Sequence, residues 1–157
     1  MTLPTSTTPR LASSFQRAGA MGFDLMLLSL PEALLMLTFG PESAISILGR
    51  FLIYAAYFAW FESSPWQATP GKRIFKIYVA RQGGTKLTPA QALERFLVFM
   101  VFTFPAQLSM LSQDTAALLT VWIFLIWLMP ILATQERTGV HDMVCRTRVW
   151  IGVKAEK

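Results

Sequence analysis

Four long apolar runs, separated by polar segments, dominate the hydrophobic pattern of the chain. The first, second and fourth runs are close to the roughly 20 residues that an α-helix needs to cross a bilayer, and the third, which is the shortest, reaches about nineteen if Leu93 is included. The short Gly40-Pro41-Glu42 turn after the first run forces the first two helices into an antiparallel hairpin. The pattern therefore predicts four transmembrane helices, which cover about residues 18–39, 44–61, 96–111 and 116–133.

The segment between the second and third runs is polar and has a different periodicity. Residues 74–80 alternate as in a short strand, and Thr88-Pro89 indicates a helix start just before the third span. A second alternating run, residues 149–153, is suited to pair with the first. We expect Glu94 and Arg95 at the cytoplasmic edge of the membrane, where long side chains reach water.

The two ends of the chain differ in composition from the apolar runs. Residues 1–15 are rich in Ser, Thr and Pro, which is typical of a disordered tail. Residues 150–157 are expected to form a C-terminal tail. Residues 16–149 then make up a single transmembrane domain.

The distribution of basic residues predicts the orientation of this domain. Of the fourteen Lys and Arg residues, thirteen lie in segments that four spans place on one side, and Arg50 lies near the other side. The positive-inside rule therefore places both termini in the cytoplasm. The expected fold class is an all-α membrane protein with four transmembrane helices and short cytoplasmic strand segments.

The composition fits a membrane protein, with 54% hydrophobic residues, 15% charged residues and a mean hydropathy of +0.46. The pI near 9.8 follows from the placement of the basic residues, so we expect anionic lipid headgroups and not nucleic acid as a partner.

The reactive side chains are few. The chain has one cysteine, Cys145, so it cannot form an internal disulfide. It has one histidine, His141, so the spaced Cys and His ligands of a metal site are also absent. Residues 69–72 resemble only a fragment of a phosphate-binding loop. The sequence therefore predicts no enzyme activity, no metal and no cofactor.

The first apolar run carries three ionisable residues, Arg17, Asp24 and Glu32. In an α-helix they fall within about 80° of one another and rise roughly 22 Å along the axis. An ionised group in hydrocarbon costs about 2.5 to 3.5 kcal/mol, so such residues usually face a protein interior or a cavity. Asp24 is either a proton or cation ligand or a structural partner of Arg17, and the residues leave both interpretations open.

Glu32 lies about as deep in the first helix as Arg50 does in the second, counted from the turn between them. Opposite charges at one depth in hydrocarbon are expected to pair, because pairing lowers the cost of both. We predict a structural ion pair. The alternative is a carboxylate gated by a guanidinium in an ion path.

Three segments resemble the RDD family of membrane proteins: Arg17-Ala18-Gly19-Ala20-x-x-x-Asp24, Thr69-Pro70-Gly71-Lys72-Arg73-Ile74-Phe75-Lys76-Ile77-Tyr78-Val79, and residues 138–149 with the His141-Asp142 pair. The arginine and two aspartates that name the family map to Arg17, Asp24 and Asp142. The resemblance implies a small multi-pass protein of the bacterial inner membrane. Some members are reported as sodium or proton antiporters.

Arg17, Lys72 and Asp142 all lie on the predicted cytoplasmic side. Our hypothesis is a cytoplasmic polar cluster in which Arg17, Asp142 and the Gly71-Lys72 turn close over Asp24. The first functional hypothesis is a transporter coupled to a proton or a monovalent cation, working as a homo-oligomer. The alternative is a non-transporting membrane accessory or assembly protein. Its basic cytoplasmic face would then bind another protein or anionic lipid.

Overall fold

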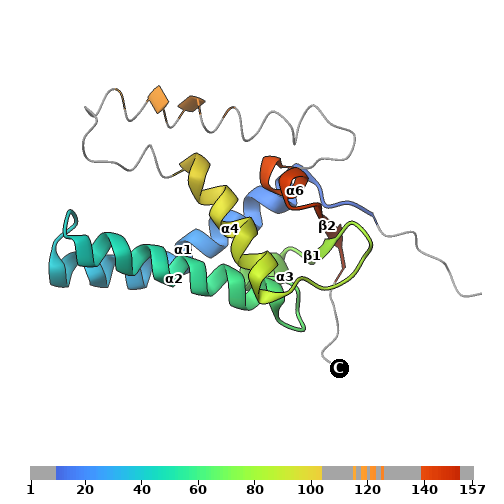
Figure 1. Ribbon diagram of the computed structural model, residues 1–157, viewed down its shortest axis with the longest axis horizontal. Coiled ribbons are helices and arrows are strands. Elements are labelled where there is room, and N and C mark those ends of the chain that lie inside the picture. The colour runs from blue at the N-terminus through green and yellow to red at the C-terminus, as the bar shows by residue number, and fades with distance from the viewer. Residues whose placement is uncertain are drawn as a thin grey trace, which may run out of the picture.

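A computed structural model describes residues 10–103 and 139–152, together with Thr115, Leu118, Leu119, Val121, Trp122 and Leu125. The described part is mostly helical and contains one small sheet (Figure 1). Its elements are α1 (Ser14–Phe39), α2 (Ala44–Ser63), α3 (Pro70–Ile74), β1 (Ile77–Arg81), α4 (Pro89–Thr103), α6 (Val140–Val144) and β2 (Thr147–Ile151).

Helices α1 and α2 form a long antiparallel hairpin and lie side by side in Figure 1. Both are long and apolar enough to cross a membrane, and they correspond to the first two predicted spans. Gly40 ends α1 with a φ of +84°, a left-handed conformation that glycine adopts without a steric cost. Ser43 then caps the N-terminus of α2 by accepting a hydrogen bond from the Ser46 N–H.

Helix α1 begins four residues before the predicted start of the first span. Ser13 and Gln16 form a capping box, in which each side chain accepts a hydrogen bond from the other residue's backbone N–H, at 3.2 and 3.0 Å. The chain before it, Arg10 to Ser13, lies along the sheet. Ala12 N–H donates to the Val149 carbonyl at 2.9 Å. The prediction of a disordered tail over residues 1–15 is therefore wrong for residues 10–15.

Helix α4 starts at Pro89 and continues through Arg95, so the predicted helix start and the beginning of the predicted third span are one helix. Thr88 and Gln91 bond reciprocally at 3.1 and 3.3 Å, the same capping arrangement that opens α1. The remainder of the third span, residues 104–111, lies outside the described residues. So does most of the fourth span, residues 116–133.

Strands β1 and β2 pair antiparallel, with Ile77 opposite Ile151 and Val79 opposite Val149. The sequence predicted that residues 74–80 pair with residues 149–153. The observed strands are shifted from these ranges by a few residues each. Thr69 caps a short helix over Pro70–Ile74, and this helix delays the first strand to Ile77. The second strand ends at Ile151, so residues 150 and 151 belong to the strand that the alternating run 149–153 predicted.

Two apolar cores stabilise the fold. The cap, which we define as residues 10–13, α3, β1, α6 and β2, is built on a core that includes Ala20, Ile77, Val79, Leu87, Ala92 and Val149. A second core lies between α1, α2 and α4, and consists of Leu28, Ala55, Phe58 and Phe96. Along α1 the buried face reads Ala20, Asp24 and Leu28. Asp24 therefore lies at the level between the two cores.

Helix α3 lies so close to α1 that only glycine fits at position 71. A Cβ atom there would lie 2.2 Å from the Ala20 carbonyl oxygen and 2.8 Å from the Asp24 carboxyl carbon. Because the main obstacle is backbone, neither helix can relieve the overlap by turning a side chain.

We predict that Gly71→Ala lowers the free energy of unfolding by about 1–3 kcal/mol, because α3 must move away from α1. The measurement is the thermal or denaturant-induced unfolding of the purified protein in detergent. Gly83→Ala is the matched control, since nothing lies within 4 Å of its added methyl group. Equal stability of the two variants would contradict the close packing of α3 on α1.

Candidate functional site

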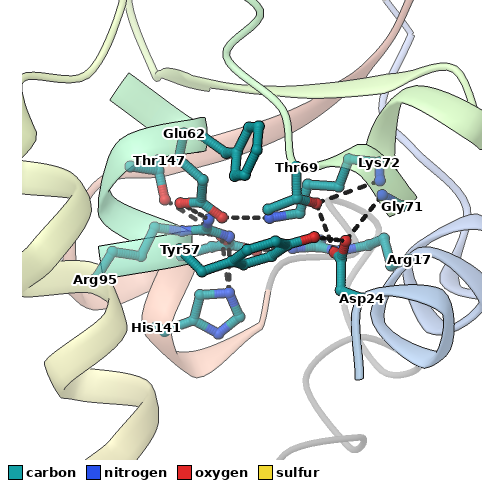
Figure 2. A network of polar contacts seen from close by, with 12 residues as sticks. Arg17, Asp24, Tyr57, Glu62, Thr69, Gly71, Lys72, Arg95, His141 and Thr147 are labelled. Carbon is teal, nitrogen blue, oxygen red and sulfur yellow. Dashed lines mark hydrogen bonds and ion pairs between the residues drawn. The ribbon is translucent and has the colours of Figure 1, made fainter. Parts of the chain in front are cut away.

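A polar network lies where the cap meets the long helices, and Figure 2 shows it from close by. We call it the cap network. Its members come from α1, α2, α3, α4, α6, β2 and the N-cap of α3, and they are Arg17, Asp24, Tyr57, Glu62, Thr69, Gly71, Lys72, Arg95, His141, Asp142 and Thr147.

Asp24 is fully buried on α1 and accepts three described hydrogen bonds. Tyr57 Oη donates to Oδ1 at 2.7 Å, and Gly71 N–H donates to the same oxygen at 2.8 Å. Thr69 Oγ1 donates to Oδ2 at 2.5 Å. All three donors are electrically neutral. Asp24 thus joins α1 to α2 and to the first turn of α3.

Glu62, near the end of α2, is held by two cations. Arg95 Nη1 lies 2.6 Å from Glu62 Oε2, and the Lys72 ammonium forms an ion pair with Oε1. Glu62 is 3% exposed and Arg95 is 4% exposed. Because ionised carboxylates are rarely buried unless they are paired, both cations are needed to keep Glu62 charged here.

Asp142, in the first turn of α6, has the most complete set of partners in the described part of the network. Arg95 donates to Oδ1 from Nη2 at 2.6 Å and from Nε at 3.2 Å. Arg17 forms an ion pair with Oδ2. Thr147 Oγ1 and the Gly139 N–H add bonds at 3.2 Å each. A carboxylate with this many donors is stable in its charged form although it is fully buried.

The ion pairs form one alternating chain. In order, it runs through Lys72, Glu62, Arg95, Asp142 and Arg17. These residues come from α3, α2, α4, α6 and α1. With Asp24, the cluster holds three cations and three carboxylates, so its formal charges balance. The ion-pair chain therefore ties five helices together without leaving a net charge in the interior.

His141 adds a neutral ring to the cap network. Arg95 Nη2 lies 2.8 Å from His141 Nε2. Since a guanidinium can only donate, Nε2 must accept, and this excludes the doubly protonated ring. Burial, together with the positive charges of Arg95, Arg17 and Lys72, holds the pKa of His141 well below its usual range. Burial also lowers the pKa of Lys72, and the nearby Glu62 carboxylate opposes that change.

A cavity of about 340 Å³ adjoins the cap network. Its walls are mostly apolar and include Met21, Leu25, Phe58, Phe96 and Phe99. Charged members of the network, among them Arg17, Lys72 and Arg95, complete the lining. The described residues contain no group of three or more His, Cys, Asp or Glu side chains placed to hold a metal ion.

A second polar contact lies farther along the hairpin, toward the Gly40 turn. Arg50 Nη1 lies 3.0 Å from Glu32 Oε1, and Tyr54 Oη donates to Glu32 Oε2 at 2.8 Å. The structure thus brings together the two residues that were predicted to pair by depth. Tyr54 adds a donor from the next turn of α2, which spacing along one helix does not reveal.

The structure also brings the predicted cytoplasmic cluster together, with different partners for some members. Arg17 contacts Asp142, and Gly71 contacts Asp24, as the hypothesis placed them. Lys72 binds Glu62.

The predicted cluster left out six members of the network, which are Tyr57, Glu62, Thr69, Arg95, His141 and Thr147. The expectation that Arg95 lies at the edge in water is wrong, because α6 covers it. Its position next to buried Phe96 and three residues after buried Ala92 was the available signal.

Comparison with models of protein families shows which family the chain belongs to. The model of the RDD family matches residues 11–146, which is most of the chain. This chain belongs to the RDD family. The matched range contains every member of the cap network except Thr147. Comparison of this RDD protein with curated proteins and with solved structures gives no match. Family membership and the two long apolar helices identify a membrane protein.

Arg95 is the member of the network whose loss is expected to cost the most. In Arg95→Met, Glu62 and Asp142 both lose a cation while they stay buried, and breaking a buried ion pair in this way costs about 3–5 kcal/mol. We predict a decrease of that size in the unfolding free energy of the RDD protein in detergent. Glu94→Gln, an exposed neighbour on the same helix, should change it by less than about 0.5 kcal/mol. Similar stability of Arg95→Met and the wild type would refute the central position of Arg95.

The neutral state of His141 makes stability depend on pH. The unfolded chain binds a proton at His141 near pH 6.5, whereas the folded protein resists it because the folded pKa is lower. This contribution is complete above about pH 6.5 and is lost as the pH falls below that value. We therefore predict a lower melting temperature at about pH 5.5 than at about pH 7.5. His141→Gln should flatten that difference, and an unchanged pH dependence in the variant would rule out His141 as its source.

Proposed function

We propose that this RDD protein is a transporter coupled to a proton or a monovalent cation, with Asp24 as the titrating ligand. One observation carries the proposal. Glu62 and Asp142 are each bound by two cations, whereas the described hydrogen bonds of Asp24 all come from neutral groups. A proton or a small cation can therefore bind Asp24 without first breaking an ion pair.

The ligands around Asp24 suit such an ion. The Tyr57 hydroxyl oxygen lies 2.7 Å from one carboxylate oxygen of Asp24, and the Thr69 hydroxyl oxygen lies 2.5 Å from the other. Hard monovalent and divalent cations prefer oxygen ligands, and a proton needs only one carboxylate oxygen. The site can thus exchange one positive charge for another, as coupled transport requires.

The contacts of Asp24 also supply a way to transmit its charge state. Protonation of Asp24 weakens its hydrogen bonds to Thr69 and Gly71, because a neutral acid is a poorer acceptor than a carboxylate. Both residues belong to the start of α3, which carries Lys72 and its ion pair with Glu62. The cavity next to Lys72 offers space for this movement. A change in the charge of Asp24 thereby alters the ion pairs of the chain, beginning with Lys72 and Glu62.

The proposal includes a location and an assembly state. The protein is a multi-pass protein of the bacterial inner membrane with four spans and both termini in the cytoplasm. The Glu32–Arg50 pair lines or seals the outer half of the hairpin. Four spans are few for a transport path, so we infer a homo-oligomer or a complex with a partner protein. We expect neither enzyme activity nor a cofactor.

The second candidate is a membrane accessory protein that transports nothing. It is supported by exposed basic residues on the cap and on the segments that connect its elements, which would attract an acidic partner. They are Arg10, Lys76, Arg81, Lys86 and Arg146.

Transport in everted membrane vesicles separates the two candidates. After a pH gradient is formed, addition of Na⁺ or K⁺ is expected to dissipate it in vesicles with the wild-type protein, and Asp24→Asn should abolish that response. Fluorescence of a pH-sensitive dye is the measurement.

Lys86→Gln, which changes an exposed loop, is the control and should behave as the wild type does. Equal dissipation with Asp24→Asn would refute the assignment of Asp24. No dissipation with any protein, at equal amounts in the membrane, would favour the accessory role.

A further inference from the structure

Two segments of the cap have the same construction. Each consists of a five-residue helix, one residue with φ near −85°, one residue in the left-handed region, and a five-residue strand. The first segment runs through α3 and β1, and the second runs through α6 and β2. Every element of the second lies 70 residues after its counterpart in the first, as the bounds of α3 (Pro70–Ile74) and α6 (Val140–Val144) show.

The pairing of the strands relates the two segments by an approximate two-fold axis. Val79 lies opposite Val149, and these are equivalent positions in the two segments. Ile77 pairs with Ile151, and Arg81 pairs with Thr147, which exchanges the two ends of the strand as a two-fold rotation does. Features at equivalent positions therefore lie at equivalent places on the two sides of the sheet.

Two such features are exposed and have the same chemistry. The last residue of each short helix is aliphatic and open to the surroundings, with Ile74 56% exposed and Val144 58% exposed. Two residues later each segment has an exposed basic residue, Lys76 or Arg146. Both adopt a left-handed conformation, with φ of +54° and +50°. That conformation disfavours most L side chains, yet both segments have a long cationic one there.

The short helices lie beside the long ones. The ring of Phe75, next to Ile74, packs so tightly on α1 that a Cβ at Gly19 would meet it at 2.4 Å. On the other side, α6 packs on α4, and the His141 ring meets the Phe99 ring at 6.3 Å between centroids. Exposed aliphatic residues beside apolar helices, each followed by a cation, are typical of the interface between lipid tails and headgroups.

We propose that Ile74 with Lys76, and Val144 with Arg146, form two equivalent sites for anionic phospholipids of the leaflet next to the cap. The aliphatic side chain contacts the acyl region, and the cation binds the headgroup phosphate. Charge complementarity favours this occupant. Within residues 10–13, 70–95 and 140–151, the exposed charged side chains are five cations and one carboxylate, Glu94. The inference does not depend on transport.

Native mass spectrometry of the purified full-length protein, titrated with phosphatidylglycerol or phosphatidylcholine, tests the two sites. The wild type should retain two tightly bound phosphatidylglycerol molecules per chain. Lys76→Asn and Arg146→Asn should each retain one, and the double variant none. Asparagine tolerates the left-handed conformation, so these variants should melt at or above the wild-type temperature although they lose lipid.

Lys86→Asn is the matched control, because Lys86 is exposed but its neighbour Leu87 is buried. It should retain both lipids. The same loss in Lys86→Asn would overturn the proposal in favour of diffuse attraction to the basic cap. Equal retention of phosphatidylcholine would also overturn it, and so would full displacement of the bound lipid by soluble glycerol phosphate.

Discussion

The Arg95 guanidinium, held between Glu62 and Asp142, is the contact on which the rest of this structure depends. It uses Nη1 for Glu62, and Nη2 and Nε for Asp142, and it also donates to His141. Glu62 comes from the end of α2 and Asp142 from α6, so one side chain of α4 joins the hairpin to the C-terminal part of the cap. A lysine has no planar fork with which to reach both carboxylates at once.

The polar layer around Arg95 separates two apolar cores with different tasks. The core beneath the sheet holds the cap together, whereas the core of Leu28, Phe58 and Phe96 joins the long helices. Buried ion pairs add little net stability compared with apolar packing, but they are costly to break. The buried ion pairs therefore determine which faces of the helices pack together, because any other packing would leave a buried charge without its partner. Asp24 differs from the other two carboxylates of this layer in that its described hydrogen bonds all come from neutral groups.

Much of the hairpin could be predicted from sequence, because its determinants are local. Apolar length predicted α1 and α2, the Gly40-Pro41 turn predicted their antiparallel course, and depth below that turn placed Glu32 near Arg50. The structure of the cap was harder to predict from sequence. Residues 10–13 read as a tail because their partner strand, β2, lies far away in sequence. Arg95 was placed in water because its burial depends on α6, which lies 45 residues later in the chain, and its helical spacing from Ala92 and Phe96 was the one local signal.

The ion-pair chain has a consequence for biosynthesis. Its members are made in the order Arg17, Glu62, Lys72, Arg95 and Asp142, and the last appears 47 residues after the fourth. Until Asp142 leaves the ribosome, Arg17 and Arg95 lack the carboxylate that joins them in the finished fold. Glu62 can pair with Lys72 and Arg95 before then, whereas the pairs of Arg17 and Arg95 with Asp142 form last. Docking of α6 on α4 is therefore the step that completes the ion-pair chain.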